Sequence, residues 1–301
     1  MSEPIYATTR DLVAPQLLAS AADLDLVARW VVEGFLHGLH RSPYVGFSVE
    51  FASHREYLPG DDLRHLNWKL YGRHDRLYVK EYDAETNLDL HLVVDVSNSM
   101  TGGQGSTKFR YAALLAASLA HLSARQRDAV GLTLFADRVL EHTRARANPD
   151  HRMEILHALA NVRQHPAADS ARVLHEVAEL MPRRGLVVLI SDLYFEVNEL
   201  LDALSHFRHF GHDLLAFHVL TPLERRMDAD GPVRFDDLET GQQITTQAHE
   251  IRLAYTTAVD DWTKTLERGC LGRELDYAQL VTDAPLDRAL YEYFVKRTQL
   301  Y

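Results

Sequence analysis

The stretch that most constrains the fold is residues 88–108, an apolar run that ends in an acidic, hydroxyl-rich turn. Aliphatic residues predominate from Leu90 to Val96, a length typical of a buried strand. Asp95, Ser97 and Ser99 stand at alternate positions at the end of this run, so a loop leaving the strand can turn three oxygen-bearing side chains toward one point. Because ligands bind at the carboxyl ends of strands in open α/β sheets, the stretch predicts a central strand with a binding site at its end.

The chain after residue 108 alternates between helical and strand patterns. A second apolar run, from Leu186 to Ile190, is followed by Ser191 and Asp192, which predicts another acid at the same edge of the sheet. Further strand patterns cover 128–136, 138–144 and 213–220, with a hairpin around Gly241, and helical patterns cover about 108–125, 149–162, 170–181, 196–209, 249–268 and 285–297. This order predicts a doubly wound, mostly parallel α/β sheet. The residues expected in its core are Leu92, Val94, Leu132, Leu134, Val187 and Leu189.

The chain before this region has a different pattern. Apolar residues recur at helical spacing within 11–39, and short strand patterns follow near 47–51 and 77–82. We therefore expect two parts. Residues 1–86 form a helix and β segment, and this segment packs on an α/β domain formed by residues 87–301.

The composition excludes several classes of function. Lys and Arg number 32 against 43 Asp and Glu, and the net charge of −11 predicts no general attraction to nucleic acid or anionic membranes. No apolar run approaches the roughly 20 residues of a membrane helix, and the first residues show no secretion signal. Cys270 is the single cysteine, which fits a reducing compartment. We expect a cytoplasmic protein with no membrane insertion.

Asp95, Ser97, Ser99 and Asp192 together would offer only hard oxygen ligands. Such a set suits Mg²⁺, Mn²⁺ or Ca²⁺ and disfavours zinc. A loosely held ion also keeps an open position that a carboxylate of a partner protein can fill. The alternative is that Ser97 and Ser99 only bond the turn and cap the following helix. The spacing alone supports these two interpretations equally.

Two motifs carry a resemblance to known families. The run from Asp95 to Ser99 resembles the DxSxS metal-ion-dependent adhesion site of von Willebrand factor A domains, a Rossmann-like α/β fold. The run RxYxPGDDxRxxxWK, together with the strand at 186–192 and the segment 235–241, resembles the bacterial family named domain of unknown function 58. The residues of that run are Arg55, Tyr57, Pro59, Gly60, Asp61, Asp62, Arg64, Trp68 and Lys69.

The resemblance implies a non-enzymatic interaction module. Ser97 and Ser99 would bind the metal directly, while Asp95 and Asp192 would act largely through water. The implied partners are a MoxR-type AAA+ ATPase and a protein that bears an acidic group, and the pair would act in assembly or maturation of other proteins. The adhesion site usually adds a threonine, but Ala168 stands at that position here. Either Asp169 or Ser170 substitutes for the threonine, or this loop contributes no ligand.

Several alternatives compete with this interpretation. A metal-dependent hydrolase acting on phosphoesters is the enzymatic one, although the sequence places no general base beside Asp95. The glycine-rich loop before Lys108 has the wrong residue order for a phosphate-binding loop. His206, His209 and His212 could hold zinc, but solvated histidines near a helix end are the simpler account. The acidic segments within 224–240 serve either as a second contact surface or as cover for a sheet edge.

Overall fold

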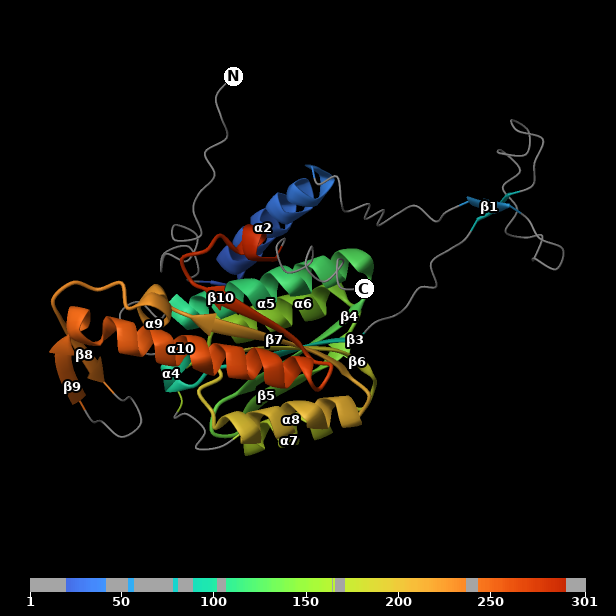
Figure 1. The fold of residues 1–301 in the computed structure, drawn as a ribbon. Coiled ribbons are helices and arrows are strands. Elements are labelled where there is room, and N and C mark those ends of the chain that lie inside the picture. Colours follow the sequence, from blue (N-terminus) through green and yellow to red (C-terminus); the bar gives the residue numbers. More distant parts are fainter. Residues whose placement is uncertain are drawn as a thin grey trace, which may run out of the picture.

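A computed structural model describes residues 20–41, 54–56, 78–80, 89–101, 107–163, 165, 171–236 and 243–290. Its centre is a six-stranded sheet in the order β10-β7-β6-β3-β4-β5 (Figure 1). The neighbours in this sheet are parallel except for β4 and β5, which form an antiparallel hairpin. The strand bounds are β3 Asp89–Asp95, β4 Ala129–Phe135, β5 Val139–Arg146, β6 Gly185–Ser191, β7 Asp213–Leu220 and β10 Asp276–Val281. The predicted mostly parallel α/β sheet is confirmed.

Helices cover both faces of this sheet (Figure 1). One face packs against α5 and α6, with α2 outside them, in a single apolar cluster. The other face packs against α7, α8 and the carboxyl-terminal part of α10. The helix bounds are α2 Ala21–Arg41, α4 Asn98–Thr101, α5 Thr107–Gln126, α6 Pro149–Ala160, α7 Arg172–Glu179, α8 Val197–His209, α9 Pro222–Arg226 and α10 Ala248–Leu271.

The predicted core residues are all buried. Leu92 and Val94 of β3 lie at the centre of the sheet, and their exposed fraction is 0%. They contact the α5 side, because successive side chains of a strand point to opposite faces. Val187 and Leu189 of β6 lie on the other face, beneath α7 and α8. The prediction of buried central strands at 90–96 and 186–190 is thereby confirmed.

Smaller elements flank the sheet. β1 His54–Glu56 and β2 Tyr78–Lys80 form an antiparallel pair, and β8 Pro232–Asp236 pairs with β9 Gln243–Gln247 as the predicted hairpin. The sequence did not predict β10, which adds a parallel strand beside β7. In the described part of the chain, we find no helix with the length and apolarity that crossing a membrane requires.

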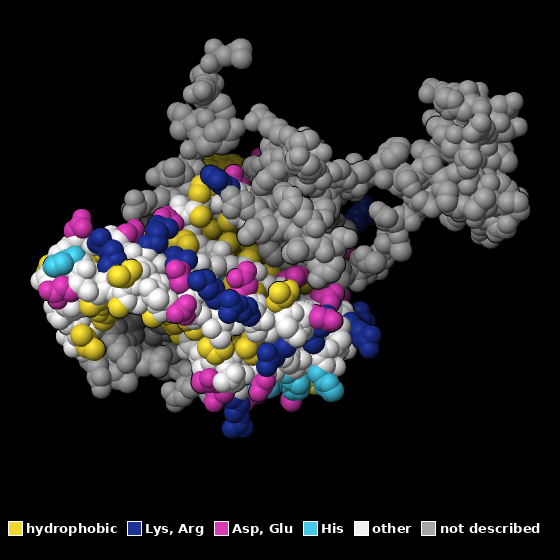
Figure 2. Space-filling view, viewed as in Figure 1, with side chains coloured by type: hydrophobic (Ala, Val, Ile, Leu, Met, Phe, Trp, Pro, Cys, Tyr) yellow, Lys and Arg dark blue, Asp and Glu magenta, His cyan; other side chains and the backbone are white. Residues whose placement is uncertain are grey.

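The surface over α10 carries mixed charge. Figure 2 shows Lys and Arg side chains interspersed with Asp and Glu side chains on this face. Some of them are paired, as Arg225 of α9 is with Asp260 of α10 at 2.7 Å. Ion pairs at the surface, such as this partly exposed one, contribute little to stability, but they break up any field of a single sign.

Candidate metal site at the carboxyl edge of the sheet

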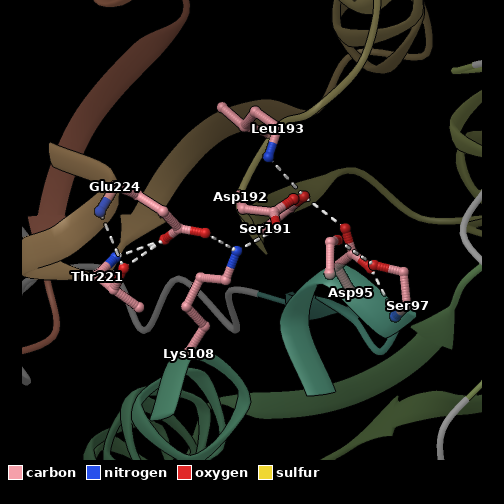
Figure 3. A network of polar contacts seen from close by, with 9 residues as sticks. Asp95, Ser97, Lys108, Ser191, Asp192, Leu193, Thr221 and Glu224 are labelled. Atoms are coloured by element: carbon pink, nitrogen blue, oxygen red, sulfur yellow. Dashed lines mark hydrogen bonds and ion pairs between the residues drawn. The ribbon is translucent and has the colours of Figure 1, made fainter. Parts of the chain in front are cut away.

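The ends of β3 and β6 bring the predicted acidic residues together. The two strands are parallel neighbours with Val94 opposite Ile190, so Asp95 and Ser191 leave the sheet side by side. The Ser191 hydroxyl donates a hydrogen bond of 2.6 Å to Asp95 Oδ2 and accepts one of 2.9 Å from the Leu193 N–H (Figure 3). The backbone N–H of Ser97 donates to Asp95 Oδ1 at 2.9 Å. Asp95 is thus held in one orientation by groups from both strand ends.

The two serines of the turn place their hydroxyl oxygens together. Ser97 Oγ lies 2.9 Å from Ser99 Oγ. Adjacent ligands of an octahedral Mg²⁺ ion, with metal–oxygen distances of about 2.1 Å, are separated by about 3 Å. Ser97 is buried whereas Ser99 is half-buried, so the pair opens toward solvent on the Ser99 side. The donor set therefore fits a hard divalent cation held by Ser97 and Ser99, with Asp95 behind them.

Burial and the neighbouring Asp192 carboxylate raise the pKa of Asp95 to about 6. Hydrogen bonds from Ser191 and Ser97 to the carboxylate oppose this shift, since they stabilise the charged form. A cation next to Asp95 would relieve the repulsion between the two carboxylates.

Asp192 has a partner that the sequence did not predict. Lys108, near the start of α5, is buried, and its ammonium group lies 2.8 Å from Asp192 Oδ2 and 2.6 Å from Glu224 Oε1. Burial opposes the charge on Lys108, but the two carboxylates outweigh it and raise the pKa of this ammonium above its ordinary value. The sequence patterns assigned no role to Lys108, and so this buried ion pair was missed.

The chain geometry around Glu224 fixes its carboxylate. Thr221 and Glu224 form a capping box at the start of α9, in which the Thr221 hydroxyl and backbone N–H both donate to Glu224 Oε2. The other carboxylate oxygen is thereby left for Lys108 (Figure 3). The Thr-Pro-Leu-Glu run is a sequence signal for such a helix start, although it does not indicate the lysine.

An aromatic pair borders the site. Leu193 has a positive φ of 55°, an uncommon conformation for a bulky residue, and the next residue, Tyr194, is exposed. The Tyr194 ring stacks on Trp262 of α10 with 5.5 Å between centroids, and the Lys108 ammonium lies 4.9 Å from the Tyr194 ring centre. Tyr194 thus lies between the buried Lys108 ammonium and the protein surface.

The loop that would carry the usual threonine begins beside the site. Ser97 and His165 form an isolated parallel β-bridge, so the chain that leads into this loop touches the serine turn. Ala168, Asp169 and Ser170 lie outside the described residues. Of the upstream motif, the structure describes only the backbone of Arg55, in β1. The other motif residues lie outside the described residues: Tyr57, Pro59, Gly60, Asp61, Asp62, Arg64, Trp68 and Lys69.

The structure does not gather His206, His209 and His212 at one point. His206 Nδ1 lies 2.9 Å from His175 Nδ1 of α7, while the His212 ring lies against His91 with 5.7 Å between centroids. Among the residues that the structure describes, no group of three or more His, Cys, Asp and Glu side chains is arranged to hold a metal. The oxygen set at Ser97 and Ser99 depends instead on hydroxyl groups.

Proteins of two mycobacteria are similar to this chain in sequence, and two solved structures align with much of it. Uncharacterized proteins of Mycobacterium tuberculosis and Mycobacterium bovis are each 29% identical over 237 residues, which cover 77% of this chain and 74% of the relative. The BatB protein of Bacteroides thetaiotaomicron aligns over 71% of this chain and 100% of its own length, with 14% identity and a TM-score of 0.43. A von Willebrand factor type A protein of Catenulispora acidiphila aligns over 70% of this chain and 42% of its own length, with 13% identity and a TM-score of 0.37.

A family model covers most of the chain and includes both strand ends that form the site. It matches residues 53–265 and is described as protein of unknown function DUF58. This range contains the upstream motif, the serine turn, Lys108, Asp192 and Glu224. The chain therefore belongs to the DUF58 family.

Proposed function

We propose that this chain is a protein-interaction module that recognises an acidic group of a partner protein through a divalent cation at the carboxyl edge of β3. Ser97 and Ser99 would hold the ion, and Asp95 would act on it through water. The ion would supply a positive charge with an open position for a carboxylate. The side chains of this protein orient that position and keep the surrounding carboxylates apart.

The charge balance of the site carries this proposal. Three carboxylates gather here, those of Asp95, Asp192 and Glu224. Within the described residues, the Lys108 ammonium is the cation in contact with two of them. Two negative charges therefore remain in a largely buried cluster, where unpaired charge is costly. One divalent cation beside Asp95 would balance them.

Thermal unfolding with EDTA, Mg²⁺, Mn²⁺ and Ca²⁺ tests the metal. A ligand that binds only the folded state stabilises it by RT ln(1 + [L]/Kd), so a millimolar site in roughly 10 mM metal gains about 1.4 kcal/mol. We expect the midpoint to rise with metal in the wild type and to stay unchanged in Asp95→Asn and Ser99→Ala. An exposed control, Ser20→Ala, should respond like the wild type. Equal responses in all four proteins would refute a site at Asp95.

The partner is the second part of the proposal. Resemblance of the upstream motif supports a MoxR-type AAA+ ATPase, and the chemistry of an open metal position supports an acidic group on the protein that is bound. A tagged chain should recover such an ATPase in the presence of ATP and Mg²⁺, and Ser99→Ala should reduce recovery of the acidic partner. Recovery of neither protein by the wild type would count against this partnership.

The metal-dependent hydrolase is less well supported. In the part of the chain that the structure describes, Asp95 accepts hydrogen bonds from the Ser97 backbone N–H and the Ser191 hydroxyl, and neither group is a general base at neutral pH. Turnover of a generic phosphoester that disappears in Asp95→Asn would reverse this ranking.

A further inference from the structure

The buried ammonium group of Lys108 lies beside the candidate metal site, on its Asp192 side. Lys108 lies in the first turn of α5, and its ammonium group bridges Asp192 at the end of β6 and Glu224 of α9. The exposed fraction is 5% for Lys108 and 1% for Asp192, so water contributes little to screening this pair. The bridge therefore ties together three segments that are far apart in the sequence.

The bridge changes the role expected for Asp192. Sequence resemblance assigns this carboxylate to the metal, but in the structure its Oδ2 atom is in direct contact with an ammonium group. A divalent ion that approached Asp192 would meet the positive charge of Lys108 at short range, where repulsion between like charges is strong in a buried setting. Asp192 cannot serve both cations fully.

We propose that Lys108 is a built-in cation that competes with the metal for Asp192. It neutralises part of the negative charge at this edge of the sheet when no metal is bound, confines the metal to the side of Asp95, Ser97 and Ser99, and weakens metal binding. The part that concerns metal rests on the proposed function. The consequence is a folded protein that holds its ion loosely and can exchange it.

The test compares Lys108→Met with Lys264→Met, which removes an exposed lysine of α10. Calorimetric titration with Mn²⁺ measures affinity, and thermal unfolding in EDTA measures stability without metal. We expect Lys108→Met to bind Mn²⁺ at least tenfold more tightly than the wild type, because the repelling charge is gone. It should also melt lower in EDTA and recover with Mn²⁺. Lys264→Met should match the wild type in both measurements.

A second variant covers the case in which Lys108→Met does not fold. Lys108→Met combined with Glu224→Gln removes one carboxylate together with the ammonium, and it should show the same gain in Mn²⁺ affinity. Asp192→Asn tests confinement of the metal: it should bind Mn²⁺ more weakly than the wild type, because a nearby negative charge is lost, but it should still bind measurably. Loss of binding in Asp192→Asn as complete as in Asp95→Asn would overturn that confinement.

Mn²⁺ binding by the wild type tests the proposed function. The ratio of the Mn²⁺ affinities of variant and wild type tests the role of Lys108. Mn²⁺ binding by the Lys108 variants alone would refute the metal in the native protein and support the competition. Equal affinity in wild type and variants would overturn the competition and leave the metal site standing. If no protein in the series binds Mn²⁺, both proposals fail.

Discussion

At the scale of single residues, burial decides which side chains matter most for stability. Leu189 of β6 is fully buried and lies opposite Val93 of β3 and Ala216 of β7. It packs in the cluster beneath α7 and α8. A side chain in this setting contributes both its removal from water and the contacts that fill the space around it.

Replacing Leu189 by alanine should lower the free energy of unfolding by about 2–5 kcal/mol, since the truncation leaves a cavity that the surrounding strands cannot close. Urea denaturation measures this change. Leu253→Ala is the control, because Leu253 on α10 is 81% exposed, and its change should stay within about 0.5 kcal/mol. A wild-type midpoint for Leu189→Ala would show that β6 is not packed as described.

The sequence could place Asp95 and Asp192 because each follows an apolar run whose direction and end are visible locally. It could not place Lys108 against Glu224, since 116 positions separate them and only the order of strands in the sheet brings them together. The metal, the partner and the role of Ser99 stay predictions.

At the scale of elements, the close approach of β3 and β6 depends on a residue without a side chain. Gly185 begins β6 opposite Asp89 of β3. A Cβ atom at Gly185 would lie 2.0 Å from the Asp89 carbonyl oxygen, which belongs to the backbone and cannot rotate away. The strand pair that carries the candidate site therefore needs glycine here.

Gly185→Ala should push β6 away from β3 and lower the free energy of unfolding by about 1–3 kcal/mol. Chemical denaturation gives the value. Gly272→Ala is the matched control. Its φ of −64° suits any residue, and its nearest contact for a Cβ is 3.3 Å, so its effect should be below about 1 kcal/mol. An equally small effect at Gly185 would contradict the register of β3 and β6.

Elements differed in how well the sequence indicated them. Continuous aliphatic runs made β3 and β6 predictable, and β7 was also expected. β10 was missed because its residues, DYAQLV, neither alternate nor form an apolar run, and Leu280 is the one of them that is buried. This strand forms because β7 offers an unpaired edge, which is a property of the assembled sheet and not of the local sequence.

At the scale of the whole molecule, buried imidazoles couple stability to pH. Burial lowers the pKa of His218 to about 3, with the Lys108 charge adding to the effect, and burial and the neighbouring His212 lower the pKa of His91 to about 4. In the unfolded chain both groups take up a proton near pH 6.5. The unfolded state therefore binds more protons than the folded state between pH 6.5 and 4.

The free energy of unfolding should consequently fall as the pH is lowered from about 6.5 to 4.5, by an amount on the order of a few kcal/mol. Urea denaturation at successive pH values measures the slope. His218→Gln retains a polar side chain that can bond to the Tyr277 hydroxyl but does not titrate, so its slope should be shallower than that of the wild type. Parallel curves for the two proteins would show that His218 does not carry this dependence.

The position of β10 has a consequence for how the chain is made on the ribosome. β7 is complete at Leu220, but its outer neighbour begins only at Asp276, after α9, the β8–β9 hairpin and α10 have been synthesised. At about 5–20 residues per second this interval lasts on the order of seconds. During that time the nascent chain presents an open strand edge, which is a template for pairing with other chains. We therefore expect this protein to depend on a chaperone most during its synthesis, when the edge of β7 can pair with other chains.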